Sequence, residues 1–164
     1  SSLYKTIGSR RIMGKTSKEG IVTREMAAAD LKAVQAIEQE SFHDSWAVES
    51  WLAELNSSIA KYIVLEQDAI IKGFAGFWLI AGEAQVTRVA VAKDERGKGL
   101  GKILTEVLIA AAWQEGADAV TLEVRKSNIA AQTVYTQTGF TISGVRPNYY
   151  EDNKEDAIIM WLYR

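Results

Sequence analysis

The sequence predicts an α/β sandwich with a mixed sheet, built as a single domain. Segments with the two-residue alternation of strands take turns with segments whose apolar residues recur every three or four positions, as in helices. The chain has 164 residues, 48% of them hydrophobic, which suits one core of ordinary size. No internal repeat or linker argues for a second domain.

The first twenty residues differ from the rest in composition. Residues 1–20 are rich in Ser, Gly and Lys without a clear period, so we expect a flexible basic N-terminal extension with little fixed structure. Its net charge is +4, which leaves −6 for the predicted domain at residues 21–164. The basic residues are few and lack interleaved aromatics beyond Tyr4, so direct nucleic-acid binding is not expected.

Strand and helix segments alternate through the predicted domain. The expected strands cover residues 21–23, 61–66, 70–80, 85–91, 119–124, 140–145 and 157–163. The expected helices run from Asp30 to Phe42, from Trp46 to Leu55, from Leu100 to Gly116 and from Ser127 to Gly139. An aspartate is a preferred helix cap, and glycine is the preferred residue just past a helix end.

The stretch from Gln85 to Gly101 has the layout of an anion-binding cradle. A buried strand leads into a charged turn with glycine at positions 97, 99 and 101, and then directly into an amphipathic helix. Glycines let backbone N–H groups approach a ligand closely, and the N-terminus of a helix favours negative charge. Lys98 and Lys102 stand where an acid would be expected, which indicates a place for a ligand's charge. A tight turn before a helix, without a ligand, is the alternative.

The strand before this turn shows a break in its alternation. Val86 is out of phase with Val89 and Val91, which indicates a β-bulge that would splay the strand and free backbone groups for a ligand. Residues 88–102 are locally basic, with five positive and two negative side chains. A basic pocket in an acidic body suits an anionic cofactor and a cationic second substrate.

The composition also excludes several kinds of site. Without cysteine there is no disulfide, thiolate metal site or acyl-cysteine intermediate, so any acyl transfer would be direct. A single histidine, His43, argues against a histidine-based zinc centre or a Ser-His-Asp triad, and we expect no metal. No apolar run approaches the length of a membrane span, and the N-terminus lacks a signal peptide's apolar region. We therefore expect a cytoplasmic protein without membrane contact, as a monomer or weak dimer.

Two residues in the second half of the chain are candidates for acid–base chemistry. Glu123 lies inside a predicted strand, where glutamate is disfavoured. It is either a general base for an attacking amine or a surface charge paired with Arg125 or Lys126. Tyr135 lies on the following helix and is either a core aromatic or a general acid for a departing thiolate.

Two aromatics lie in the connection S-F-H-D-S-W at residues 41–46. Phe42 and Trp46 either form one wall of a binding groove or plug the core from a loop, and both readings stay open. His43, near a helix end, is expected to be a capping group rather than a catalyst. Because the basic charge gathers at the glycine-rich turn, the opposite mouth of the site should be acidic, with Glu83 and Glu123 as contributors that attract a cationic acceptor.

Several motifs resemble the GCN5-related N-acetyltransferases (GNAT). R-x-x-G-x-G occurs at Arg96, Gly99 and Gly101 after a V-A-V strand, as in the acetyl-CoA pyrophosphate loop of that family. The segments T-L-E-V-R-K-S-N-I-A-A-Q-T-V-Y-T-Q-T-G-F from Thr121, R-P-N-Y-Y from Arg146 and E-D-A-I-I-M from Glu155 look like its RimI type. That type acetylates the N-terminal alanine of a small-subunit ribosomal protein. The resemblance covers about residues 20–164.

The resemblance implies a single-domain GNAT-like fold, with a mixed, mostly antiparallel sheet flanked by helices. It implies an acetyl-CoA-dependent N-terminal protein acetyltransferase with Glu123 as base and Tyr135 as acid. The expected cofactor-binding residues are Val89, Ala90, Val91, Arg96, Gly97, Lys98, Gly99, Leu100, Gly101, Lys102 and Asn128. The expected acceptor-binding residues are Phe42, Trp46, Glu83, Tyr149 and Tyr150. Ser45 departs from the proline that the family usually has before Trp46, which puts the shape of the acceptor groove in doubt.

Two other functions remain as alternatives. One is a GNAT acetyltransferase that modifies a lysine side chain or a small amine, and the other is a non-catalytic sensor that binds acetyl-CoA. The presence of both Glu123 and Tyr135 argues against the sensor, since binding needs only the loop. The Tyr149-Tyr150 pair favours a peptide acceptor over a small amine.

Overall fold

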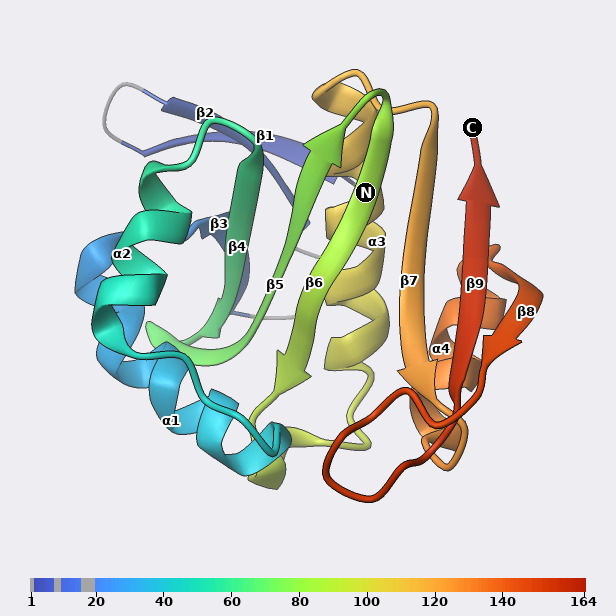
Figure 1. Cartoon of the computed structure of the whole chain (residues 1–164). Coiled ribbons are helices and arrows are strands. Elements are labelled where there is room, and N and C mark those ends of the chain that lie inside the picture. Colours follow the sequence, from blue (N-terminus) through green and yellow to red (C-terminus); the bar gives the residue numbers. More distant parts are fainter. Residues whose placement is uncertain (1, 8–9, 16–19) are drawn as a thin grey trace.

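A computed structural model describes residues 2–7, 10–15 and 20–164 of the chain. The main sheet has seven strands in the order β3-β4-β5-β6-β7-β9-β8 (Figure 1). The strands are β3 (Ile21–Glu25), β4 (Ala60–Gln67), β5 (Ile70–Ile80), β6 (Glu83–Val91), β7 (Ala119–Arg125), β8 (Thr141–Arg146) and β9 (Ala157–Tyr163). All neighbouring pairs are antiparallel except β6 with β7. The mixed, mostly antiparallel sheet is therefore confirmed.

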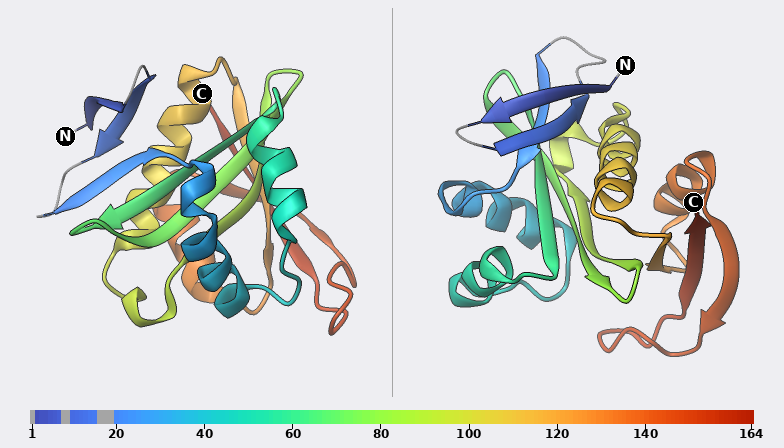
Figure 2. Two further views of the ribbon diagram at one scale, coloured as in Figure 1. Left: turned by 90° about the vertical axis from the view of Figure 1, so that its left-hand side faces the viewer. Right: turned by 90° about the horizontal axis from the view of Figure 1, so that it is seen from above.

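Helices cover both faces of this sheet (Figure 2). They are α1 (Leu31–Ser41), α2 (Val48–Asn56), α3 (Leu100–Gln114) and α4 (Ile129–Gln137), with short 3-10 turns η1 (Ala28–Asp30) and η2 (Lys93–Glu95). One core, which includes Trp51 and Phe74, lies under α1 and α2. A second core, which includes Leu104 and Phe140, lies under α3 and α4. No helix in the part of the chain that the structure describes combines the length and the apolar character needed to span a bilayer.

The N-terminal segment contains regular structure. β1 (Ser2–Ile7) and β2 (Arg10–Lys15) pair antiparallel as a separate two-stranded sheet, which corrects the expectation of little fixed structure over residues 1–20. Ladder hydrogen bonds use backbone groups that nearly every residue carries, so strands can pair without the apolar alternation that announces them. Residues 1, 8–9 and 16–19 lie outside the described residues, and the flexibility of this extension stays a prediction.

Two helix starts also differ from the sequence prediction. The carboxylate of Asp30 accepts the backbone N–H of Ala27 at 2.8 Å and pairs with Arg24, and it makes no capping hydrogen bond to α1. Asp30 therefore closes the η1 turn instead of capping the long helix. The second helix begins at Val48, two residues later than predicted.

The pairing of β6 with β7 is short. Glu83–Gln85 face Ala119–Thr121 in a parallel ladder of three positions, and the two strands then diverge toward the lower end of the sheet in Figure 1. Beyond Gln85, the β7-facing edge of β6 has no strand partner among the described residues. Buried backbone groups need hydrogen-bond partners, and no strand supplies them on this edge. A ligand that lies along the edge can therefore bind to these groups.

A bulge in β6 lies just beyond this short ladder. Gly76 of β5 faces Arg88, while the next residue, Phe77, faces Val86, so Thr87 is the extra residue. This confirms the bulge that the sequence predicts. The hydroxyl of Thr87 lies 2.9 Å from that of Tyr62, and Arg88 approaches α1, so both side chains face the α1–α2 side of the sheet.

Candidate active site

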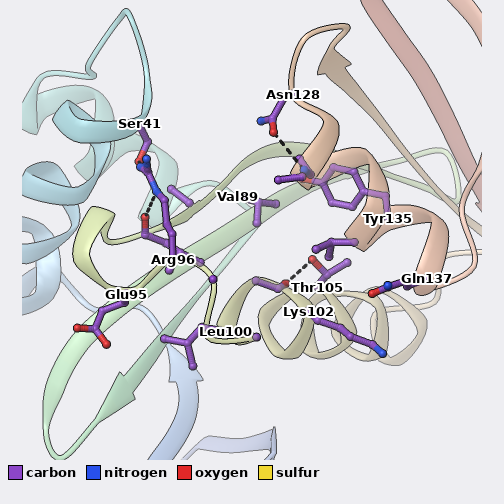
Figure 3. Close-up of a pocket in the computed structure, with 18 of the residues that line it drawn as sticks. Ser41, Val89, Glu95, Arg96, Leu100, Lys102, Thr105, Asn128, Tyr135 and Gln137 are labelled. Atoms are coloured by element: carbon purple, nitrogen blue, oxygen red, sulfur yellow. Dashed lines mark hydrogen bonds between the residues drawn. The ribbon is translucent and has the colours of Figure 1, made fainter.

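A pocket of about 510 Å³ lies where the end of β6 meets α3 and α4 (Figure 3). Ten of the eleven residues that the sequence predicts for cofactor binding line it, and Lys98 does not. The Lys98 ammonium instead pairs with Glu95 at 3.3 Å. Sequence reasoning missed other lining residues, namely Ser41, Glu95, Thr105, Ala130, Ala131, Val134 and Gln137. The lining residues on α4 recur at the spacing of one helix face, and this pattern in the sequence could have predicted that they line the pocket.

The glycines of the turn have separate roles. Gly97 and Gly99 have φ of +81° and +85°, where any other residue is strained. A Cβ added to Gly97 would meet no atom within 4 Å, and one added to Gly101 would meet only Val91 Cγ2 at 3.9 Å. Gly101 lies in the first turn of α3 without a positive φ. Its lack of a side chain keeps space open in the pocket, whereas the other two glycines make the turn.

The N-terminus of α3 gives the pocket an anion-binding character. The first turn contains no acidic residue, and Lys102, which lines the pocket, is exposed. The first N–H groups of a helix have no partner within it, and they carry the positive end of its dipole. A phosphate group fits this arrangement on grounds of both charge and hydrogen bonding.

Arg96 pins the turn to its surroundings. Its Nε donates to the Val91 carbonyl at 3.1 Å, and its Nη2 donates to the Ser41 hydroxyl at 3.0 Å. Nearby, the Thr105 hydroxyl donates to the Gly101 carbonyl at 2.7 Å. Glu95 accepts from Lys72, which with Lys98 lowers the pKa of that carboxyl. These contacts fix the shape of the turn.

Tyr135 is both a core aromatic and a lining residue. It is 9% exposed, packs edge-on against Phe140 with ring centroids 5.7 Å apart, and lines the pocket. Burial raises the pKa of its phenol, so it holds its proton at neutral pH. Asn128 accepts the Ala131 N–H at 3.1 Å and so caps α4, which carries this tyrosine.

Glu123 lies on the other side of the sheet from Tyr135. Its neighbours Leu122 and Val124 point into the core under α3 and α4, so its carboxylate points away from them. The carboxylate pairs with Arg146 Nε at 3.7 Å and keeps a side-chain exposure of 33%. The surface-charge alternative predicted Arg125 or Lys126 as the partner, and the structure corrects this to Arg146. Glu123 does not line the pocket, and it lies on β7 beyond the point where β6 diverges.

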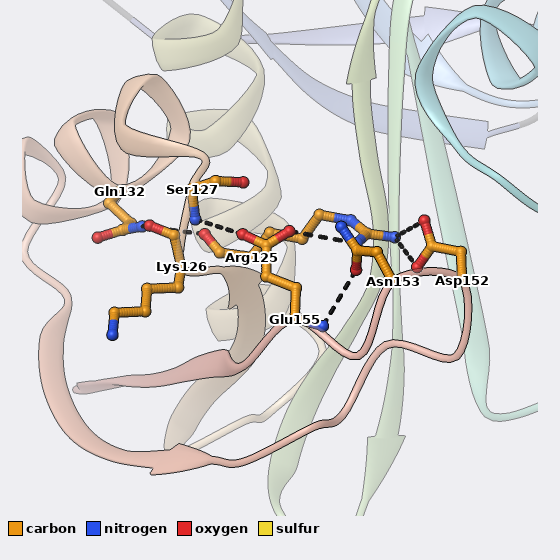
Figure 4. Close-up of polar contacts among 7 residues, drawn as sticks. All are labelled: Arg125, Lys126, Ser127, Gln132, Asp152, Asn153 and Glu155. Carbon is orange, nitrogen blue, oxygen red and sulfur yellow. Dashed lines mark hydrogen bonds and ion pairs between the residues drawn. The ribbon is translucent and has the colours of Figure 1, made fainter.

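Arg125 instead braces the loop between β8 and β9 (Figure 4). Its guanidinium binds the Asp152 carboxylate at 3.0 and 3.1 Å and Glu155 at 3.3 Å. Glu155 in turn accepts the backbone N–H of Ser127 at 2.6 Å. These contacts tie residues 147–156 to the segment that starts α4.

The predicted tyrosine pair lies on this braced loop. The rings of Tyr149 and Tyr150 are 5.1 Å apart and perpendicular, and the Arg125 guanidinium lies 4.0 Å over the Tyr150 ring. Burial raises the pKa of Tyr150 to about 12, and the charge of Glu123 contributes to the rise. Tyr150 therefore lies within electrostatic range of Glu123. Tyr149 is exposed.

The two alternatives for the α1–α2 connection each hold for one residue. Phe42 lines the pocket, as a groove wall would. Trp46 packs against Trp51 with ring centroids 4.8 Å apart, as a core plug would. His43 is exposed, and its charge is one of the causes that lower the pKa of Asp152, after the Arg125 hydrogen bond that overcomes desolvation. This connection and the β8–β9 loop therefore face each other at the lower end of the sheet in Figure 1.

Glu83 is not brought to this site. It pairs with Ile80 and Ala119 at the start of β6, whereas Val89 lies six residues further along the strand. At about 3.3 Å per residue this places Glu83 about 20 Å away. Its prediction as an acceptor residue is therefore corrected: it shares a strand with the pocket but lies at the opposite end.

In the part of the chain with described side chains, residues 20–164, no three His, Asp or Glu side chains gather as a metal site would require. The site is built instead from a backbone cradle, a buried phenol and, across the gap, a carboxylate beside two tyrosines. A pocket suited to an anion on one side and a surface with a carboxylate and two tyrosines on the other fit a transfer between two substrates.

Comparison with known proteins points the same way. The acetyltransferase (GNAT) family matches residues 28–140. The ribosomal protein bS18-alanine N-acetyltransferase of Escherichia coli (strain K12) is 34% identical over 84% of this chain and 93% of that protein. A Bacillus subtilis (strain 168) protein that carries the same name provisionally is 37% identical over 88% of this chain and 97% of its own length. The crystal structure of the Escherichia coli ribosomal-protein-S18-alanine N-acetyltransferase superposes with a TM-score of 0.79 at 32% identity, covering 87% of this chain and 93% of that one.

Proposed function

Because this chain belongs to the acetyltransferase (GNAT) family and is an acyltransferase, we propose that it transfers acetyl from acetyl-CoA to the N-terminal α-amine of a small-subunit ribosomal protein that begins with alanine. The observation that carries this proposal is the arrangement around the gap that opens where β6 and β7 diverge. The pocket lies on one side of this gap, and Glu123 with the tyrosine loop lies on the other; we call these the two half-sites. The names of the relatives supply the acceptor class. The proposal also includes the oligomeric state, a monomer or weak dimer, and the location, the cytoplasm. It includes no metal, no direct contact with nucleic acid and no contact with a membrane.

The pocket residues fit acetyl-CoA. Backbone N–H groups of residues 97–102 would hold the pyrophosphate, because the N-terminus of α3 favours negative charge and the absence of a side chain at Gly101 leaves space beside it. The edge of β6 at Val89–Val91, which has no strand partner among the described residues, would bind the pantetheine arm, and Asn128 would contact the cofactor from α4. Acetyl-CoA supplies the activated thioester on which the transfer depends.

Glu123 is the proposed general base. A peptide α-amine has a pKa of about 8 and is mostly protonated at neutral pH, so it must lose a proton before it can attack. Glu123 lies on the open side of the gap, where an acceptor arrives, and would take this proton directly or through water. The amine nitrogen then bonds to the acetyl carbon, and the bond from that carbon to sulfur breaks.

Tyr135 is the proposed general acid. It lines the pocket on the cofactor side and retains its proton because burial raises its pKa. It would donate this proton to the departing sulfur. A thiol has a pKa of about 8.5, so the demand on the acid is mild. Because the chain has no cysteine, the transfer cannot pass through a cysteine thioester on the enzyme.

Tyr149, Tyr150 and Phe42 form the proposed acceptor surface. Tyr150 lies within electrostatic range of Glu123 on a loop held by Arg125, Tyr149 packs against Tyr150, and Phe42 lines the pocket. Rings and hydroxyls suit the backbone of an extended peptide. The acidic groups here, Glu123 among them, suit a cationic terminus.

A panel of short peptides tests the proposal. Peptides that differ only in their first residue should react when it is alanine or serine and fail when it is large and β-branched or aromatic, because a pocket rejects excess bulk. Spermidine, free lysine and a peptide with an acetylated terminus and an internal lysine serve as competitors. Comparable rates with these amines would replace the proposal with the small-amine or lysine alternative.

A further inference from the structure

A buried cation lies directly beside the proposed site. Arg88 is only 6% exposed and immediately precedes Val89, a pocket-lining residue of β6. Because of the bulge at Thr87, the Arg88 side chain points toward α1 and not toward the pocket. None of the roles proposed above uses it.

The side-chain partners of Arg88 come from the end of α1 and the connection after it. Its Cζ lies 4.3 Å from the ring centroids of both Phe42 and Trp46. Its Nη2 lies 3.4 Å from Asp44, and its Nε lies 3.5 Å from Oε2 of Glu38. One side chain on β6 therefore contacts three residues of the segment 42–47.

Glu38 extends this contact set to the same segment. It is fully buried, and its Oε1 accepts the backbone N–H of Trp46 at 3.1 Å and the indole N–H of Trp51 at 3.2 Å. The carboxylate thus fixes the backbone where the connection re-enters the core. Arg88 supplies the positive charge that a buried carboxylate needs.

This pair is poorly built as a stabilising device. Among the described residues, Arg88 Nε and Nη1 and Glu38 Oε2 have no hydrogen-bond partner. Buried polar atoms without partners lower stability, and an apolar replacement of similar volume often stabilises. Arg24 offers the contrast, because it binds Asp30 through two hydrogen bonds of 2.7 and 2.8 Å. The pair is therefore weak evidence for a purely stabilising role.

We infer that Arg88 is a positioning residue that holds the connection at residues 42–47 in place as the acceptor wall. Phe42 joins the two roles, since it lines the pocket and also stacks on Arg88. The guanidinium thereby links the strand beside the reacting centre to the wall opposite Tyr149 and Tyr150. This inference rests on the proposed function, and it assigns Arg88 to acceptor affinity and not to cofactor binding.

Arg88→Met tests the inference, with Arg24→Met as the matched control. We expect the KM for an alanine-initiated peptide to rise about tenfold in Arg88→Met, because a loosely held wall misplaces the acceptor. The affinity for acetyl-CoA should stay within about twofold. Amide hydrogen exchange in residues 42–47 should become faster. Arg24→Met, which removes an ion pair remote from the gap, should leave both the peptide KM and this exchange unchanged.

Two further variants separate positioning from general stability. Arg88→Lys should behave like Arg88→Met, because lysine keeps the charge but lacks the planar guanidinium that stacks on both rings. In Arg88→Ala, guanidinium ion at concentrations well below those that unfold the protein should restore the peptide KM and slow the exchange of residues 42–47. If Arg88→Met fails to fold, Glu38→Gln should show the same rise in peptide KM with unchanged acetyl-CoA affinity.

Several results would overturn the inference. These are a native peptide KM in folded Arg88→Met, an equal loss of acetyl-CoA and peptide affinity, full activity in Arg88→Lys, or no effect of guanidinium on Arg88→Ala. Failure of the proposed function would give a different result, because the wild-type enzyme itself would then not acetylate the peptide. In that case the exchange of residues 42–47 and its response to guanidinium still decide the role of Arg88.

Discussion

The proposed cofactor pocket and the proposed acceptor side of this protein are held together in different ways. The glycine-rich turn of the pocket is fixed largely by contacts between residues close in sequence, as Arg96 binding the Val91 carbonyl and Thr105 binding that of Gly101 illustrate. The acceptor side depends on side chains from distant segments, such as Arg125 with Asp152. One half-site is therefore sensitive to added atoms, and the other to lost charges.

The difference follows from what each substrate demands. A phosphate group is held by backbone N–H groups, which a turn and a helix N-terminus always provide. A peptide acceptor must be recognised by its terminus and by the size of its first side chain, which requires loops of defined shape. Loops have few backbone ladders of their own, so ion pairs and stacked rings hold them here.

The largest effect should come from Glu123→Gln, which removes the proposed general base while leaving the structure of both half-sites unchanged. We expect turnover to fall by about two to four powers of ten, with acetyl-CoA affinity unchanged and the acidic limb of the pH–rate profile weakened. Glu83→Gln is the control, because this glutamate lies at the far end of β6. Near-native turnover of Glu123→Gln at neutral pH would make Glu123 a surface charge paired with Arg146.

Gly101→Glu should break the pocket alone. The added carboxylate enters the cradle and repels phosphate groups, so acetyl-CoA affinity measured by calorimetry should fall at least about 100-fold. The fold should survive, because this residue has no positive φ and its Cβ has room. Gly116→Glu places the same side chain at a strained turn beyond the other end of α3 and should leave the affinity unchanged. Undiminished binding in folded Gly101→Glu would remove the assignment of the cradle.

Arg125→Met should break the acceptor side alone. Losing the contacts to Asp152 and Glu155 frees the loop that carries the tyrosines, so the peptide KM should rise about tenfold while acetyl-CoA affinity stays within about twofold. Steady-state kinetics with each substrate varied gives both numbers. Arg164→Met, beside Trp113, serves as the control. A parallel loss of both affinities would mean that the two half-sites are not independent.

Acid should produce the smallest effect, and mainly in the β8–β9 loop. Hydrogen bonds from Ser127 lower the pKa of Glu155, and those from Arg125 overcome desolvation to lower the pKa of Asp152. Because both folded-state values are depressed, their stabilisation is present above the ordinary carboxyl values of about 4 and is lost as the pH falls through the lowered values. Hydrogen exchange of residues 147–156 should rise there before that of residues 96–102. The contacts of Glu95 with Lys72 and Lys98 also weaken in acid, but the ties of this turn through Arg96 do not titrate. In Arg125→Met this dependence should shrink, and an unchanged dependence would contradict the assignment to the Arg125 contacts.

The same contrast separates what the sequence predicts from what it does not. The β6 bulge, the glycine-rich turn and the helix after it are local patterns, and the structure bears out each of them. Pairing between distant side chains leaves no local pattern. Arg88 with Glu38, Arg125 with Asp152, and Glu123 with Arg146 therefore went unpredicted.

Three errors have identifiable physical causes. Glu83 was placed at the acceptor mouth because charge and strand membership are visible in the sequence, whereas the length of the strand that carries it away is easily overlooked. Asp30 was expected to cap the long helix, but Arg24 and the Ala27 N–H compete for its carboxylate and hold it one turn earlier. The hairpin of β1 and β2 was missed because its pairing is made by backbone alone.

The three-position ladder between β6 and β7 has a consequence for the order of folding. Strands β4, β5 and β6 follow one another as an antiparallel meander, whereas β7 joins them only across the α3 crossover and through a parallel ladder. Pairings that close long loops form late, because the chain entropy is lost before the contacts compensate for it. Amides of β4–β6 should therefore gain protection before those of β7–β9 in pulse-labelled refolding. In a folding chain, β6, the strand that leads into the glycine-rich turn, would then be paired before Glu123 and Tyr135 reach the site. The enzyme would become able to catalyse the transfer only when β7 and α4 join the sheet in the last folding step.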